Sequence, residues 1–384
     1  MPSWYSLYDC RRWRHTQLVF MQPQGPHVTA EQARALDDDF FTSQPLKLFT
    51  ARVASLLDDA PSPGDSELAA GFATALGRGE IRDILAVDGA DRDLCRALDA
   101  LALRHHAAET LVRFAHAVLV AEPGGNSTDA ACTWAKISSE MRNNVQIVAQ
   151  LNSYLDSERG LTTFWRTVIP VHERTTHMPV DTPARVQLMG DWLVHAMNLL
   201  IRDDIDISAG YNKFKHGLAI RSRNDMRVTF VNQELGDGGV PLSAVTGPDA
   251  VDLIDTISVD FLSQPRKIDG RKPGLEYTTL RLDPAVLLAE AWMIAMTHGA
   301  MFHVAAARHF DKRPEAILPV YPDIPGRPAP DQLLTGVAVG MRGPVTAQAD
   351  GGPTLRGAGF AIHDMFISVD LDHSAGRTTV IVDG

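Results

Sequence analysis

The spacing of apolar residues predicts helices over most of the first half of the chain. Between residues 92 and 120, one apolar stripe recurs at helical spacing, formed by Leu94, Leu98, Leu101, Ala108, Val112, Ala115 and Leu119. The same pattern predicts helices over 130–155 and from Thr182-Pro183 onward. Thr29 with Gln32 three residues later resembles a capping box, which marks a helix start. We therefore expect residues 29–220 to be mostly helical.

The pattern changes after residue 220. Strand-like alternation appears at 226–231 and 277–282, with the turn-forming Asp269-Gly270 between them. Short β-like runs also occur at 336–340, 366–371 and 378–382. An apolar helix is expected over 284–307, where Asp283 at the N-cap and Pro284 at the first position form a start typical of soluble helices. We interpret it as a buried bundle helix rather than a membrane span.

These elements predict an α+β fold that is mainly α. It is a helical bundle with a small β insertion and a C-terminal β appendage. The expected organisation is an N-terminal arm (1–28), the bundle (29–312) with its β insertion at about 225–282, a proline-rich connector (313–330) and a small β unit (331–384).

Composition narrows the function classes. The net charge of −11 over 384 residues argues against a surface that grips nucleic acid everywhere, and no DNA-binding signature occurs, but local basic patches remain. The three cysteines match no zinc or disulfide pattern, and their low, odd number favours the cytoplasm. Phosphate loops, nucleophile elbows and dinucleotide fingerprints are missing from the sequence, so neither a cofactor nor a metal is expected.

A short segment near residue 212 carries candidate chemistry. Asn212 and His216 are four residues apart and share one helix face. Nearby cations form a candidate nucleic-acid surface: Lys213, Lys215, Arg221 and Arg223. A second basic group follows at Arg266, Lys267, Arg271 and Lys272. One interpretation is a groove for a phosphate backbone with His216 as general acid or base. The other, which the pattern favours, is a solvated helix end where cations complement the helix dipole.

The same segment resembles the HEPN superfamily of all-helical proteins, many of which cleave RNA. The family signature is arginine, a polar residue, three residues and then histidine. This chain has Tyr211, Asn212, Lys213-Phe214-Lys215 and His216. The resemblance implies that His216, Asn212 and Tyr211 occupy the catalytic positions. Tyr211 replaces the arginine that is expected to bind the scissile phosphate, and the family also includes non-catalytic members.

A second polar face lies on the helix expected over 92–120. Its members follow one another at three- and four-residue spacing: His106, Glu109, Arg113 and His116. A carboxylate beside histidines could ligate a metal or transfer protons. The simpler interpretation, which we favour, is an exposed face stabilised by a Glu109–Arg113 pair.

Two functions follow from these observations. The sequence favours a non-catalytic interaction or scaffold protein that is associated with RNA and forms homo-oligomers. The alternative is a HEPN-like, metal-independent ribonuclease acting in defence or stress. Whether the protein is an enzyme is left open by the sequence.

Overall fold

The computed structural model describes residues 25, 27–58, 67–76, 88–120, 130–175, 180–217, 220–231, 247, 250–313, 315–348, 352, 354–363 and 365–369. Nearly all of the expected N-terminal arm and the expected strand at 378–382 lie outside these residues. The described part is α+β and mainly α, which confirms the predicted fold class.

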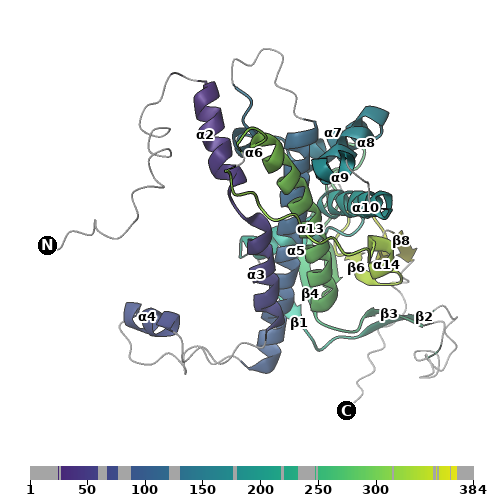
Figure 1. Cartoon of the computed structure of the whole chain (residues 1–384). Helices are drawn as coiled ribbons and strands as arrows, with labels where there is room; N and C mark the ends of the chain where they lie inside the picture. Colours follow the sequence, from purple (N-terminus) through teal and green to yellow (C-terminus); the bar gives the residue numbers. More distant parts are fainter. Residues whose placement is uncertain are drawn as a thin grey trace, which may run out of the picture. The chain divides into compact units, whose positions relative to one another are not determined.

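Helices account for most of the described chain (Figure 1). In chain order they are α2 (Ala30–Phe41), α3 (Pro45–Leu57), α4 (Glu67–Ala75), α5 (Gly89–Leu119), α6 (Thr133–Ser138), α7 (Asn144–Leu155), α8 (Glu158–Val168), α9 (Val171–Thr175), α10 (Thr182–Ile201), α11 (Ile207–Lys215), α13 (Pro284–His309) and α14 (Pro330–Leu334). The strands are β1 (Ile220–Arg223), β2 (Val228–Val231), β3 (Ala250–Ile254), β4 (Ser258–Ser263), β5 (Glu276–Arg281), β6 (Ala338–Pro344), β7 (Ala358–Ile362) and β8 (Met365–Val369).

The chain divides into two compact units. The first, the helical unit, contains residues 1–57, 103–201 and 289–330. The second, the sheet unit, contains residues 58–102, 202–288 and 331–384. The long helices α5 and α13 each contribute residues to both units.

Capping residues explain several helix starts. The capping box at the start of α2 is confirmed: the Thr29 backbone N–H donates to Gln32 Oε1 at 3.0 Å, and the Gln32 N–H donates to Thr29 Oγ1 at 3.2 Å. The helix expected over 130–155 is two helices, because Asn143 and Gln146 form a second capping box that starts α7. Such reciprocal bonds satisfy backbone N–H groups that have no partner inside the helix.

The apolar helix α13 lies largely within the protein interior. By length and composition alone it could cross a membrane, but 78% of its most apolar window is buried. The buried core helix of a soluble protein also meets these criteria of length and composition, so they are weak evidence for a membrane span. Its buried residues in the helical unit include Ile294, Met301 and Phe302, which agrees with the expectation of a bundle helix.

The proline-rich segment after α13 packs onto the helical unit through specific hydrogen bonds. Trp192 Nε1 donates to the Pro328 carbonyl at 2.9 Å, and the Tyr321 hydroxyl donates to the Val168 carbonyl at 2.8 Å. These bonds, made by side chains of α10 and of the segment itself, satisfy a buried indole and a half-buried phenol. The segment is therefore held along its length.

A buried carboxylate joins three helices of the helical unit. Glu290 on α13 is 2% exposed, and its Oε2 accepts a hydrogen bond from Arg104 Nη1 of α5 at 3.0 Å. Its Oε1 lies 2.7 Å from Nε2 of His195 on α10. Burial alone would raise the pKa of Glu290, but the charge of Arg104 and the contact with His195 outweigh it and hold the pKa below its usual value.

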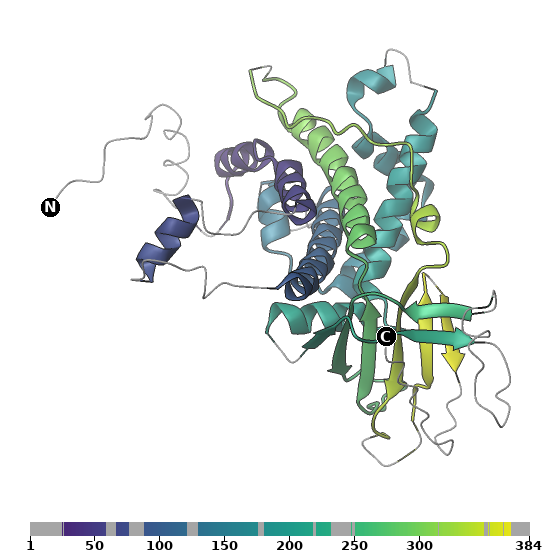
Figure 2. The same cartoon turned by 90° about the horizontal axis from the view of Figure 1, so that it is seen from below.

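The sheet unit is built on one antiparallel sheet with the order β1-β4-β5-β6-β7-β8. Strands β5 and β6 pair directly, with Thr278 opposite Arg342, although α13 lies between them in the sequence. Figure 2 shows the strands of the sheet side by side in colours from teal to yellow. The sequence placed these strands in an insertion and a separate C-terminal unit, whereas in the structure they share one sheet.

Both faces of this sheet are covered in part. The helix α11 contacts β1 and β4, and a Cβ on Gly210 would lie 2.9 Å from the Phe261 ring, so the close approach requires glycine. The two-stranded ribbon β2–β3 packs its Leu253 and Ile254 with Phe360 of β7 in a small hydrophobic core. Strands covered on both faces lose the simple alternation that marks a half-buried strand.

Replacing Glu290 tests the buried network. We expect Glu290→Leu to lower the free energy of unfolding by about 3–5 kcal/mol, because Arg104 stays buried without its carboxylate. The double variant Arg104→Met/Glu290→Leu should recover most of this loss, because it removes both charges. Urea unfolding followed by tryptophan fluorescence measures both. A loss below about 1 kcal/mol for the single variant would contradict a structural role for the pair.

Candidate functional site

The residues of the HEPN-like motif lie at the end of α11. His216 is the C-cap residue and is exposed, Asn212 is exposed on the last turn, and Tyr211 is half-buried. Within the described part of the chain, the side chains of Asn212 and His216 make no hydrogen bond or ion pair. Arg202, one arginine that could replace the missing cation, is held by Asp204 at 2.6 Å and by the His363 carbonyl. His216 is therefore exposed to solvent, and neither Tyr211 nor Arg202 provides it with the arginine of the family motif.

The expected basic residues differ in their pairing. Arg223 on β1 lies 2.6 Å from Asp225 and 3.6 Å from Asp260. By contrast, the described residues place no carboxylate within ion-pair distance of Lys213 or Lys215 on α11, nor of the exposed Arg221. Of the four cations, Arg223 is thus the one whose charge is already neutralised by neighbouring acids.

Strand register brings the two basic groups to one end of the sheet. In the β1–β4 pair Ile220 lies opposite Phe261, so β1 begins at the end of β4 that leads into the β4–β5 hairpin. The hairpin turns at Asp269 and Gly270, both with positive φ, as a two-residue turn of type I′ requires. Four exposed cations flank this turn: Arg266, Lys267, Arg271 and Lys272. The end of α11 and the hairpin therefore extend from the same end of the sheet.

A buried polar layer beneath α11 was not predicted from the sequence. Glu276 on β5 is 3% exposed and accepts a hydrogen bond from Arg342 Nη1 at 3.0 Å, while Arg356 Nε lies 2.9 Å from the same oxygen. Burial raises the pKa of Glu276 despite both arginines, and burial also raises the pKa of Asp206. Both arginines contact Oε1, whereas the buried Oε2 has no hydrogen-bond partner among the described residues. We assign the layer to sheet stability. The alternation at 277–282 predicted this strand, but the arginines that pair with Glu276 lie more than 60 residues further along the chain, so the layer itself had no local signal.

Three of the four predicted polar-face residues line a cavity of about 320 Å³ in the helical unit. Glu109 Oε1 accepts a hydrogen bond from Arg113 Nε at 3.0 Å, and His106 Nδ1 lies 3.0 Å from Arg52 Nη1. The predicted Glu109–Arg113 pair is therefore present, but the face is not simply exposed: it forms one wall of a cavity. We call this cavity the aromatic pocket.

The fourth residue, His116, lies elsewhere. It is 2% exposed, its Nε2 lies 2.8 Å from Gln150 Oε1, and its Nδ1 lies 3.4 Å from Glu140. Its contacts with α7 and the preceding loop satisfy a buried imidazole. The four residues follow one another along α5, but they have different surroundings. The first three line a cavity, whereas His116 packs against α7.

The aromatic part of the pocket lining comes from rings on α2, α5 and α13. Phe302 packs against Phe40 at a ring-centroid distance of 5.2 Å and against Phe114 at 5.5 Å. His298 meets the Phe114 ring at 5.1 Å in an edge-to-face arrangement. Phe114 and Phe302 are buried, and Phe40 is half-buried. His298 was not among the candidate residues predicted from the sequence.

His298 is a buried imidazole whose hydrogen-bonding capacity is partly unused. It is 3% exposed, and its Nδ1 has no hydrogen-bond partner within the part of the chain that the structure describes. Burial, together with the charge of nearby His106, lowers the pKa of His298 to about 4. The ring is therefore uncharged at neutral pH. Buried polar groups without a partner are uncommon and costly.

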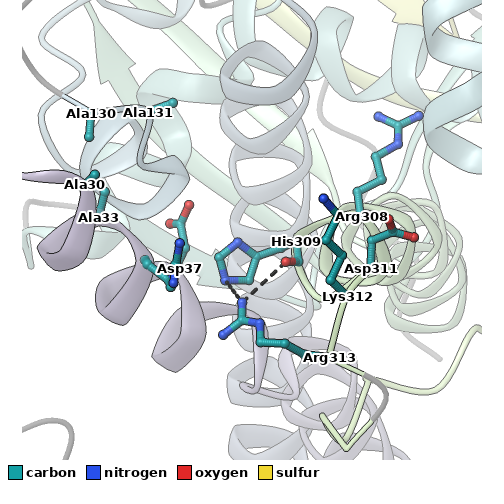
Figure 3. Close-up of a pocket in the computed structure, with 11 residues that line it drawn as sticks. Ala30, Ala33, Asp37, Ala130, Ala131, Arg308, His309, Asp311, Lys312 and Arg313 are labelled. Atoms are coloured by element: carbon teal, nitrogen blue, oxygen red, sulfur yellow. Dashed lines mark hydrogen bonds between the residues drawn. The ribbon is translucent and has the colours of Figure 1, made fainter.

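A second cavity of about 630 Å³ lies between α2 and the end of α13 (Figure 3). Asp38 lies beside it and binds His309 Nε2 at 2.6 Å and Arg313 Nη1 at 2.7 Å. Burial opposes ionisation of Asp38, but the bonds from Arg313 and His309 outweigh it and lower the pKa of the carboxyl. Asp37 is engaged too, because it accepts the backbone N–H groups of Thr133 and Trp134. These four residues therefore stabilise the contact between α2, α6 and the end of α13.

Metal and thiol chemistry find little support in the described ranges. They contain no group of three or more histidine, cysteine, aspartate or glutamate residues that could hold a metal ion. Burial raises the pKa of the Cys132 thiol to about 11, so it is not a reactive thiolate at neutral pH.

Comparison with protein-family models, with curated proteins and with solved structures finds no match for this chain. The HEPN resemblance therefore stays a prediction, and function has to be inferred from the sites themselves.

The unprotonated state of His298 predicts a pH dependence of stability. Its pKa is about 4 in the folded protein against an ordinary value of 6.5. Between these values the unfolded chain binds a proton that the folded chain does not, so stability is lost as pH falls. His298→Leu should remove this loss, and its stability relative to wild type should rise by up to about 1.4 kcal/mol per pH unit below pH 6.5.

Urea unfolding at pH 7, 6 and 5 measures the effect, and the exposed His216→Leu serves as the matched control. A constant difference between His298→Leu and wild type over this range would contradict a buried, neutral His298.

Proposed function

We propose that this protein is a non-catalytic interaction protein that associates with single-stranded RNA through the basic end of its sheet unit. The basic end comprises the cations of the α11 terminus and of the β4–β5 hairpin, namely Lys213, Lys215, Arg266, Lys267, Arg271 and Lys272. The observation that supports it is their common position at one sheet end. It is strengthened by the lack of nearby carboxylates at Lys213 and Lys215 within the described residues.

Charge availability distinguishes the lysines of this surface from paired arginines of the same unit. Arg227 is held by Asp252 at 2.7 Å, and Arg223 is held by Asp225. A cation already paired with an acid gains little by binding a phosphate, whereas a hydrated lysine releases a phosphate counterion when it binds. In a chain of net charge −11, such a local surface can bind RNA without making the whole protein adhere to nucleic acid.

Exposed side chains beside the hairpin favour a single strand. Tyr277 is 40% exposed on β5, next to Leu262, which is 46% exposed on β4. An aromatic ring beside a basic surface provides a face on which an unpaired base can stack. Stacked bases in a duplex cannot reach such a ring, so this surface fits single-stranded RNA better than a double helix.

The arrangement of α11 supports the non-catalytic form of this function. A general acid or base needs a partner group that stabilises the charge on the reacting phosphate. The exposed His216 has Tyr211 at the position where the family carries arginine, and Arg202 is held by Asp204. Homo-oligomer formation and a cytoplasmic location stay predictions from the sequence.

Removing the unpaired lysines tests RNA binding. The variant Lys213→Ala/Lys215→Ala/Lys267→Ala/Lys272→Ala should weaken binding of a labelled 16-nucleotide RNA in fluorescence anisotropy. The slope of log affinity against log salt should fall by roughly 0.7 for each phosphate that the variant no longer neutralises. Tyr277→Ala should weaken binding several-fold without changing the slope, because stacking releases no counterions.

The control Arg223→Ala/Arg227→Ala removes two cations that are already paired and should leave the slope nearly unchanged. An unchanged slope in the lysine variant, or an equal change in the control, would reject the basic end as the RNA surface.

Catalysis is tested separately. Purified wild-type protein incubated with the same RNA and EDTA should produce no cleavage above a buffer control on a denaturing gel, because Tyr211 cannot supply the cation that the family motif places before the histidine. Metal-free cleavage that is lost in His216→Ala, while RNA binding stays within about twofold, would instead establish the ribonuclease alternative.

A further inference from the structure

We propose that the aromatic pocket binds a planar, uncharged, bicyclic heteroaromatic molecule that makes one hydrogen bond to the imidazole of His298. The site lies in the helical unit and is independent of RNA binding by the sheet unit. Four features of the pocket support this ligand class: its aromatic lining, an unsatisfied polar atom, its charges and its volume.

The walls favour a flat aromatic ligand. Phe40 and Phe302 meet at a 66° interplanar angle, while Phe114 and Phe302 meet at 39°, so the rings that line the cavity differ in orientation. Aromatic pairs are most favourable in edge-to-face and offset-stacked geometries. A planar ligand can make both kinds of contact here, whereas a branched aliphatic molecule would make neither.

The unsatisfied nitrogen of His298 favours a ligand with one hydrogen-bonding atom. This side chain lines the pocket, and its buried Nδ1 lacks a partner among the described residues. Leaving such an atom unpaired is costly, so a ligand that completes the bond gains an interaction that water-filled surface sites do not offer. A neutral imidazole can donate or accept at Nδ1 according to its tautomer, so both ligand types need testing.

Charge favours an uncharged ligand. Among the residues that line the pocket, the carboxylate of Glu109 and the guanidinium of Arg113 neutralise each other at 3.0 Å. The buried imidazole of His298 is uncharged at neutral pH, and His106 Nδ1 lies 3.0 Å from Arg52 Nη1. A cationic ligand would meet the guanidinium and an anionic one the carboxylate. Charged ligands would also lose hydration on entering an apolar site, with no unpaired opposite charge to compensate them.

The volume limits the size of the ligand. At ~30 Å³ for each water molecule in the liquid, a cavity of about 320 Å³ corresponds to roughly ten water-sized groups. This matches a fused two-ring molecule of about ten heavy atoms, and the volume falls within the range of small-molecule sites.

Matched pairs of probes test the proposal on the full chain. Indole and indene share a shape, as do quinoline and naphthalene, but the first of each pair has a hydrogen-bonding nitrogen. We expect indole or quinoline to bind about tenfold more tightly than its hydrocarbon counterpart in ligand-observed NMR titrations. Benzyltrimethylammonium and benzoate serve as the cationic and anionic probes, and both should bind more weakly than indole and quinoline.

Two variants locate the site. His298→Leu keeps a similar side-chain volume and should abolish the preference for the nitrogen-containing probe while changing hydrocarbon affinity less than about twofold. Thr110→Trp, at a half-buried position of the lining, should fill the pocket and abolish binding of all probes. His216→Leu makes the same substitution at an exposed histidine and should change nothing, and circular dichroism checks that each variant is folded.

Four results would overturn the proposal. They are equal affinity for both members of each pair, a preference that persists in His298→Leu, tightest binding by benzyltrimethylammonium or benzoate, and binding by no probe at millimolar concentration. Failure to bind RNA would leave these measurements unaffected, because they concern the helical unit alone.

Discussion

The burial of Glu290 is the constraint on which the helical unit depends. A carboxylate removed from water must be paired and hydrogen-bonded, and Arg104 and His195 provide both partners. Because the partners lie on α5 and α10, the pair fixes where these helices meet α13. From Arg104 the chain reaches Phe114 after ten residues, and from Glu290 it reaches Phe302 after twelve, where the two rings touch. The two helices therefore run in the same direction here, and their register at Glu290 places the walls of the aromatic pocket.

The helices could be predicted from the sequence because their signals are local. Apolar stripes and capping residues lie within one or two turns, and the starts at Thr29 and Pro284 agree with the structure. The single sheet could not be predicted in this way. Its central pair, β5–β6, joins segments on either side of α13, and β4 carries buried polar residues such as Asp260 where an apolar one is expected. Only cross-strand partners such as Thr279, whose hydroxyl donates to Asp260 at 2.7 Å, explain those residues.

The candidate sites show the same limit. The spacing on α5 identified His106, Glu109 and Arg113, because residues three and four apart share a helix face. It could not show that the face borders a cavity, since that depends on Phe40 and Phe302 from distant helices. His298 was overlooked for a related reason: one histidine in an apolar helix is usually a satisfied core residue, and only the missing partner atom in three dimensions marks it as different.

Arginine and lysine have different roles in this protein, and the difference explains the charge of both proposed sites. Ion pairs in both units are made by arginines, including Arg104 with Glu290, Arg223 with Asp225 and Arg342 with Glu276. The planar guanidinium is weakly hydrated and suits such fixed pairs, whereas the lysine ammonium stays hydrated at the surface. In an acidic chain, acids that are held by arginines cannot neutralise the lysines of α11 and the hairpin. The same kind of pairing neutralises the carboxylate of the aromatic pocket, because Arg113 binds Glu109. The basic end of the sheet unit depends on unpaired lysines, whereas the aromatic pocket depends on a neutralised carboxylate. Salt should therefore weaken RNA binding strongly and affect ligand binding in the pocket little.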